Sequence, residues 1–122
     1  MIVVRHTSAG DRDDWAGDDR HRPLDKKGRK QAEQLVEQLA SYDIERILSS
    51  PYDRCVQSVE QLARARGLEI EQREELSEEL QSSAGLELAR SLAGQPVALC
   101  VHGGLSEGLV GKHLKKGEWR EA

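Results

Sequence analysis

The sequence predicts an α/β fold with three layers, in which helices flank a mostly parallel central sheet. Short apolar, β-branched runs alternate along the chain with longer segments whose apolar residues recur at helical spacing. The run at residues 97–101 is continuously apolar, which is typical of a strand buried on both faces. Strands that alternate with helices in this way favour a parallel sheet covered by helices on both sides.

Composition and charge restrict the class of protein. The 122 residues suggest one domain, 1–122, whose core is built from Leu, Val, Ile and Ala because Phe is absent. A net charge of −4 argues against a nucleic-acid partner, and no apolar stretch is long enough for a membrane span. Cys55 and Cys100 look like small core residues. With no signal peptide before Met1, we expect a cytoplasmic protein, and its oligomeric state stays open.

The chain begins with a strand that is followed by a long polar segment. Residues 2–4 are apolar and β-branched, and the run stops at Arg5 and His6. Residues 7–23 are polar and acidic, so we expect a loop. Internal Asp–Arg pairs are favoured there over a cation site at Asp18 or Asp19.

A helix is expected to start at Asp25, whose side chain makes a good N-cap, and to continue to about Ala40. Gly28 is unusual in its first turns, where it disfavours the helix by up to about 1 kcal/mol relative to Ala. Either another backbone segment approaches this position closely, or the position is under no structural constraint.

The rest of the chain repeats the alternation of strand and helix. Strands are expected at 44–49, 68–70 and 97–101, and helices at 52–66, 84–93 and 105–114. The polar residues 115–122 are expected to be loose.

Charged and imidazole side chains follow three of these strands. Arg5 and His6 end the first, Arg54 stands in the first turn of the helix after the second, and His102 and Gly103 follow the last. The carboxyl ends of parallel strands meet at one edge of a sheet, where ligands bind. Guanidinium groups bind phosphoryl oxygens bidentately, and a helix N-terminus adds N–H donors. We therefore predict a phosphate site at this edge.

Two histidines at a phosphate site permit covalent catalysis. A neutral imidazole can attack phosphorus, and a protonated one can donate to the transferring group. His6 is the predicted nucleophile, since a backbone carbonyl at the strand end can fix its tautomer. The glycines after His102 suit close approach to a bound anion. His21 and His113 are expected at the surface, and no metal or other cofactor is predicted.

The residues at this edge belong to four ordered motifs, which read VRH at 4–6, RPLDKKG at 22–28, SSPYDRCVQS at 49–58 and VHGG at 101–104. These motifs resemble the histidine phosphatase superfamily, which includes the phosphoglycerate mutases. The resemblance extends over residues 1–114, and length and spacing are most similar to the small bacterial phosphohistidine phosphatases of the SixA type. Residues 15–19 also look like the histidine-phosphatase domain appended to some actinobacterial Nudix hydrolases.

The resemblance implies a phosphoglycerate mutase-like fold and a metal-independent phosphatase. It implies that His6 accepts the phosphoryl group, while Arg5, Arg54 and His102 hold its oxygens. The phosphorylated substrate of this phosphatase is expected to be a phosphohistidine protein or a small phosphate ester. A nucleotide or sugar-phosphate phosphatase is the alternative within this class, and a non-catalytic phosphate-binding regulatory module is the alternative outside it.

The segment Leu76-Ser77-Glu78 matches the Leu-x-Glu segment in which the family often carries a catalytic acid. The resemblance implies that Glu78 protonates the leaving oxygen and then activates water. Glu75 and Glu79 remain alternatives. The small phosphohistidine phosphatases can lack this acid, since a phosphoramidate leaving group is easier to expel.

The chain departs from the family pattern at two positions near the motifs. Thr7 stands where Gly is usual, which is expected to crowd the pocket, and Ser58 stands where Thr is common. Long insertions and the final strand of larger members are also expected to be missing. An open site follows, and it suits a phosphorylated protein or small esters better than a mutase, which must exclude water.

Overall fold

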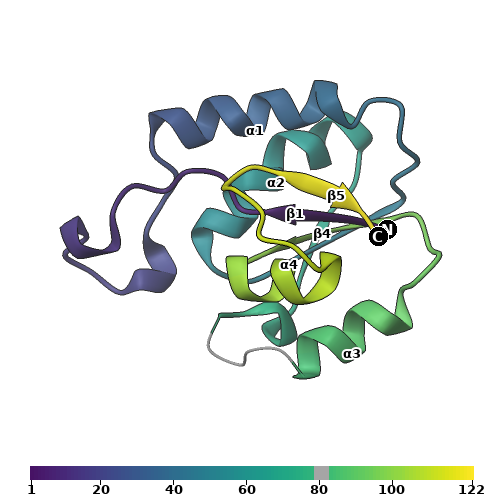
Figure 1. Ribbon diagram of the computed structural model, residues 1–122. Coiled ribbons are helices and arrows are strands. Elements are labelled where there is room, and N and C mark those ends of the chain that lie inside the picture. The colour runs from purple at the N-terminus through teal and green to yellow at the C-terminus, as the bar shows by residue number, and fades with distance from the viewer. Residues whose placement is uncertain (79–82) are drawn as a thin grey trace.

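The computed structural model describes residues 1–78 and 83–122, and these residues form a five-stranded sheet in the order β3-β2-β4-β1-β5 (Figure 1). Strands β1 to β4 pair in parallel, whereas β5 runs antiparallel to β1 at one edge. The strands are β1 (Ile2–Arg5), β2 (Arg46–Ser49), β3 (Ile70–Gln72), β4 (Val97–Val101) and β5 (Trp119–Glu121).

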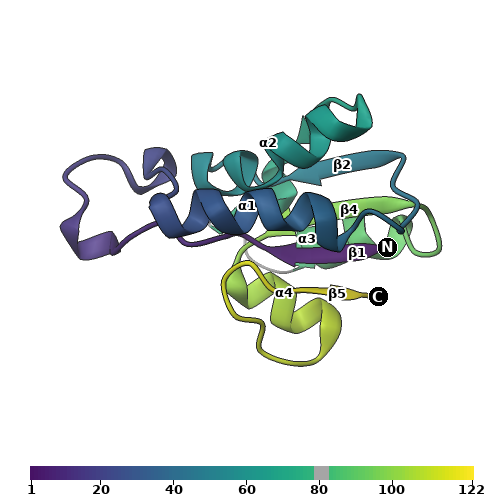
Figure 2. The ribbon, with the colours of Figure 1, turned by 90° about the horizontal axis from the view of Figure 1, so that it is seen from above.

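Helices cover both faces of this sheet (Figures 1 and 2). One face carries α1 (Lys26–Gln38) and α2 (Asp53–Arg66), and the other carries α3 (Ser83–Ser91) and α4 (Gly103–Val110). The predicted three-layer α/β class is thereby confirmed. Short 3-10 helices occupy Arg12–Asp14 (η1), Asp19–His21 (η2) and Glu74–Leu76 (η3).

The paired strands β1 and β4 divide their side chains between two hydrophobic clusters. Side chains alternate along a strand, so neighbouring residues point to opposite faces. Val4, Ala98 and Cys100 join the cluster that contains α1 and α2 residues. Val3 and Leu99 join the cluster on the other face, with residues from α3 and α4. Burial on both faces explains why β4 is a continuously apolar run.

The C-terminal residues differ from the sequence-based expectation. Residues 119–121, expected to be loose, form β5 and so supply a final strand that was expected to be missing. Trp119 packs its ring at 5.1 Å from the ring of Tyr42 in an edge-to-face arrangement. Arg120 and Glu121 are exposed. An edge strand this short and this charged carries no alternating apolar pattern, so the sequence does not predict β5.

Gly28 in α1 is explained by a close backbone approach, one of its two expected explanations. A Cβ atom at this position would lie 1.8 Å from the carbonyl oxygen of Ser8. The expected N-cap, Asp25, accepts a hydrogen bond from the Gly28 N–H at 2.7 Å and others from Ser8 and Gly10. The start of α1 therefore fixes the beginning of the polar segment that follows β1.

Candidate active site

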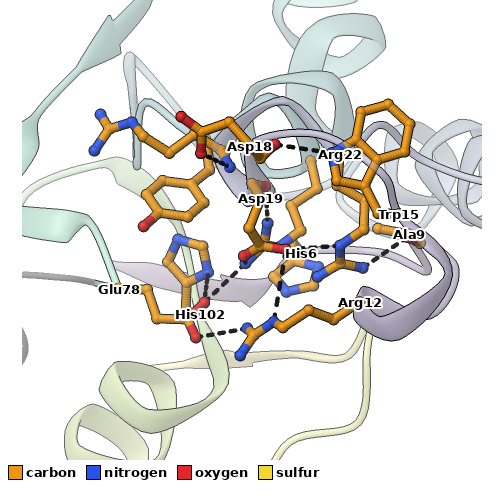
Figure 3. Close-up of polar contacts among 12 residues, drawn as sticks. His6, Ala9, Arg12, Trp15, Asp18, Asp19, Arg22, Glu78 and His102 are labelled. Carbon is orange, nitrogen blue, oxygen red and sulfur yellow. Dashed lines mark hydrogen bonds and ion pairs between the residues drawn. The ribbon is translucent and has the colours of Figure 1, made fainter.

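A cavity of about 610 Å³ lies at the carboxyl ends of β1, β2 and β4, where the sequence predicts a phosphate site. The predicted site residues all line it, although they come from segments that are distant in the sequence. Figure 3 shows His6, Glu78 and His102 among them. The lining residues are Arg5, His6, Gly10, Asp11, Arg12, Asp13, Arg22, Arg54, Glu78, His102, Gly103, Gly104 and Lys116.

His6 is buried and is held in one tautomer. Its Nδ1–H donates to the carbonyl oxygen of Thr7 at 2.8 Å, which leaves the Nε2 lone pair for chemistry. The pKa of His6 is lowered to about 3, chiefly by burial, and the hydrogen bond to the Thr7 carbonyl offsets only part of this effect. The nearby positive groups His102, Arg54 and Arg5 contribute the rest of the lowering. His6 is thus a neutral imidazole at physiological pH, as a nucleophile requires.

His102 caps the start of α4 and differs from His6 in its surroundings. The two rings meet edge to face, with centroids 5.5 Å apart. Nε2 of His102 lies 2.9 Å from Ser50 Oγ, and its Nδ1 lies 3.2 Å from a Glu78 carboxylate oxygen. Burial lowers the pKa of His102, but contacts with Cys55 and Glu78 outweigh this and raise it above its ordinary value. This histidine is therefore suited to donate to an anion.

Arg5 is anchored beside the first glycine of α4. Its Nη1 donates to the Leu114 carbonyl at 2.7 Å. The Nε of Arg5 is buried and has no hydrogen-bond partner among residues 1–78 and 83–122. A Cβ at Gly103 would lie only 3.0 Å from the Arg5 guanidinium carbon, so any larger residue there would require the guanidinium to shift.

Arg54 is fully buried in the first turn of α2. Its Nη1 donates to the Asp19 carbonyl at 2.9 Å, and its Nη2 donates to Asp19 Oδ2 at 3.1 Å and to Glu78 Oε2 at 2.8 Å. The guanidinium lies 4.9 Å from the centre of the Tyr52 ring. No partner for its Nε is found within the described part of the chain, which leaves a donor available to a ligand.

Glu78 lies among cationic groups. Besides Arg54 and His102, its carboxylate accepts a hydrogen bond from Arg12 Nη2 at 2.8 Å. The contact with His102 is the largest of the effects that hold the pKa of Glu78 far below its usual range. The carboxylate is therefore ionised in this arrangement. Of the alternative acids, Glu75 pairs with Arg73, and Glu79 lies outside the described residues.

The polar segment after β1 contributes more to the site than the sequence indicated. The expected internal Asp–Arg pair is present, since Arg22 Nε donates to Asp19 Oδ1 at 2.9 Å. The same segment also pairs Asp19 with Arg54 and Arg12 with Glu78, and it supplies much of the cavity wall. No spacing in the sequence reveals these partners, because they lie more than twenty residues away. Arg22 belongs to the motif at 22–28, although the motif alone predicts no role for it.

The two departures from the family pattern contact each other. The Thr7 N–H donates to Ser58 Oγ at 2.9 Å, and the two hydroxyl oxygens lie 3.2 Å apart. Neither residue lines the cavity, so the expected crowding by Thr7 is absent. The smaller Ser58 side chain leaves room for the larger one at position 7.

The arrangement is suited to an anion rather than a cation. Arginine and imidazole donors surround the cavity, and a helix begins at Gly103 beside it. Within the described ranges, no three His, Cys, Asp or Glu side chains are placed to hold a metal ion. His21 and His113 are exposed, as predicted. No helix in the described part of the chain is long and apolar enough to cross a membrane.

Comparison with known sequences points to one family. The model for the histidine phosphatase superfamily (branch 1) matches residues 1–87. A relative from Mycolicibacterium smegmatis, named 8-oxo-(d)GTP phosphatase, is 37% identical over 115 residues, covering 90% of this chain and 36% of the relative. The chain thus spans about a third of the length of this relative.

Solved structures share the fold. A protein of Agrobacterium tumefaciens described as the phosphohistidine phosphatase SixA is 28% identical, with a TM-score of 0.72 over 89% of this chain and 72% of its own. The protein histidine phosphatase SixA complexed with tungstate is 25% identical, with a TM-score of 0.65 over 87% and 73%. A mycobacterial glucosyl-3-phosphoglycerate phosphatase, 18% identical with a TM-score of 0.74 over 98% and 88%, shows similarity of fold alone.

Proposed function

Because the chain belongs to the histidine phosphatase superfamily, we propose that it removes phosphoryl groups through a covalent phosphohistidine on His6. Arg5, Arg54 and His102 hold the phosphoryl oxygens, and the backbone N–H of Gly103 at the start of α4 is a further donor. The phosphate charge is neutralised by these side chains, so the reaction needs no metal ion.

In the first step, the Nε2 lone pair of His6 attacks phosphorus in line. A P–N bond forms as the bond to the leaving group breaks, and the leaving group carries away the bonding electrons. The observation that carries this step is the Thr7 carbonyl, which fixes the proton on Nδ1 of His6 and directs the other nitrogen to the reaction.

In the second step, water hydrolyses the phosphoenzyme. An ionised Glu78 removes a proton from the water as it attacks phosphorus, and the P–N bond to His6 breaks to release inorganic phosphate and neutral imidazole. The low pKa of Glu78 keeps it ionised before the water attacks, and its basicity rises when the phosphoryl group takes over its contacts with His102 and the arginines. The predicted role as acid in the first step requires Glu78 to gain a proton after a substrate displaces its arginine partners.

The ionised state of Glu78 favours a phosphoramidate substrate. A phosphorylated imidazole can be protonated on its other ring nitrogen before the P–N bond breaks, so it leaves as neutral imidazole without an acid from the enzyme. The two SixA structures, which share 28% and 25% of their residues with this chain, support the same substrate class. We therefore propose a phosphohistidine protein as the leading substrate, acted on in the cytoplasm.

A nucleotide is the second candidate substrate. It is favoured by the 37% identity to the relative named 8-oxo-(d)GTP phosphatase. The cavity of about 610 Å³ also exceeds the size of a phosphoryl group, which leaves room for part of a larger substrate.

Comparing kcat/KM on a phosphohistidine protein, a panel of nucleoside phosphates and a panel of sugar phosphates tests these candidates directly. The leading proposal expects the highest kcat/KM on phosphohistidine. A preference of ten-fold or more for a nucleotide supports the second candidate instead. Binding of inorganic phosphate without turnover of any substrate indicates the non-catalytic module and contradicts the proposed function.

A further inference from the structure

We propose that Asp19 is a positioning residue that orients Arg54 and Arg22 for phosphoryl binding, and this inference rests on the proposed function. The carboxylate of Asp19 links two arginines that line the cavity. Its Oδ1 accepts from Arg22 Nε at 2.9 Å (Figure 3). Its Oδ2 accepts from Arg54 Nη2 at 3.1 Å. A third arginine, Arg12, approaches Oδ1 at 3.6 Å.

The contacts of Asp19 fix how the Arg54 guanidinium is turned. The backbone carbonyl of Asp19 accepts from Nη1 of Arg54 at 2.9 Å, while its carboxylate accepts from Nη2. Two bonds from one residue to two nitrogens hold the planar guanidinium against rotation about the Cδ–Nε bond. The remaining buried donor, Nε, has no partner within residues 1–78 and 83–122, so it stays available to an oxyanion.

Glu78 does not perform the same task. It meets Arg54 through Nη2 alone and also contacts His102 and Arg12. A phosphoryl group that binds Arg54 and His102 takes over the contacts that Glu78 makes in this structure. Asp19 contacts Arg54 from the 3-10 helix η2, and Arg22, which closes η2, is also held by the Ala9 carbonyl at 2.7 Å. The contact of Asp19 with Arg54 is therefore independent of Glu78.

The neighbouring aspartate provides a matched control. The Asp18 side chain accepts from the Arg20 N–H and caps the same 3-10 helix, and it does not line the cavity. Asp19→Asn and Asp18→Asn remove the same charge one residue apart and keep a side-chain oxygen. We expect Asp19→Asn to lower kcat on p-nitrophenyl phosphate and to weaken tungstate binding, each by about 10- to 100-fold, because misplaced groups lose catalysis on this scale. Asp18→Asn should stay within about two-fold of the wild type in both.

Testing Asp19→Asn in the Arg54→Ala variant as well as in the wild type separates a positioning role from a general effect on the fold. In Arg54→Ala, Asp19 keeps its contact with Arg22 but has no Arg54 guanidinium left to orient. Asp19→Asn should then weaken tungstate binding much less than it does in the wild type, because only the orientation of Arg22 remains to be lost. Equal losses in both backgrounds, or equal losses for Asp18→Asn and Asp19→Asn, would overturn the inference.

Calorimetric titration with tungstate keeps this test separate from the proposed function, since it needs no turnover. If no phosphate compound is hydrolysed but tungstate binding depends on Asp19 as described, the positioning role holds and the proposed function fails. If the wild-type protein binds no tungstate, the inference fails as well. Melting temperatures of all variants confirm that the compared proteins are folded.

Discussion

The two histidines of the cavity differ in their hydrogen-bond partners, and this difference underlies the roles that we propose for them. His6 donates to a backbone carbonyl and is neutral, whereas His102 faces the carboxylate of Glu78 and retains a proton more readily. A neutral nucleophile beside a cationic donor is the combination that phosphoryl transfer to nitrogen requires.

Arg54→Ala should lower kcat by about 10²–10³-fold, because one preorganised donor to the phosphoryl oxygens is lost. Arg54→Lys should restore little, since an ammonium group cannot reproduce the planar fork of donors. Steady-state kinetics on p-nitrophenyl phosphate measure both effects. Arg46→Lys is the control, because Arg46 makes a similar paired contact with Glu71 far from the cavity. Near-complete turnover in Arg54→Ala would make this residue a structural one.

Glu78→Gln should move the alkaline limb of the kcat/KM profile, which reports the free enzyme, to lower pH. Burial lowers the pKa of His102, and the contacts with Cys55 and Glu78 raise it above the ordinary value. Removal of the Glu78 charge lowers the pKa of His102, so its proton is lost earlier as the pH rises. Glu75→Gln, which changes a carboxylate paired with Arg73, should leave the limb in place. An unchanged limb in Glu78→Gln would show that His102 does not control it.

At the scale of the elements, the start of α1 and the polar segment after β1 form one structural unit. Gly28 packs against the Ser8 carbonyl, and the Asp25 carboxylate accepts hydrogen bonds from both Ser8 and Gly28. This unit places the segment that carries Asp19 and Arg22 against the cavity.

Gly28→Ala should destabilise the protein by about 1–3 kcal/mol, because the new methyl group overlaps a backbone oxygen that cannot easily move. Denaturant unfolding measures the change. Gly108→Ala provides the control within α4, where an added Cβ meets only a Leu86 side chain at 3.7 Å. There we expect a gain of about 0.5–1 kcal/mol from better helix propensity. Equal stabilities of the two variants would contradict the close approach at Gly28.

The sequence predicts the elements that are buried and the residues that end them. β4 and the strand ends at Arg5, His6 and His102 follow from apolar runs that stop at polar residues, because burial and strand geometry leave local signals. β5 leaves no such signal, since a charged edge strand needs only one apolar residue. The contacts of Asp19 and Arg12 are also hidden, because long-range ion pairs in a polar segment have no period or spacing.

At the scale of the whole molecule, the sheet edge collects cationic donors around one cavity, and the proposed chemistry uses these donors and Glu78 without a metal ion. Activity should therefore survive prolonged treatment with EDTA, followed by assay in metal-free buffer. Loss of activity that a single divalent ion restores would contradict this, and it would favour a metal mechanism at Asp18 or Asp19.

Trapping of the phosphoenzyme tests the central claim most directly. Rapid quenching with a ³²P-labelled substrate should yield an acid-labile, base-stable phosphoprotein with the label on His6. His6→Ala should abolish the label, whereas His102→Ala should slow its formation and leave His6 as the labelled residue. Label on His102, or on a serine such as Ser8 or Ser50, would contradict the account.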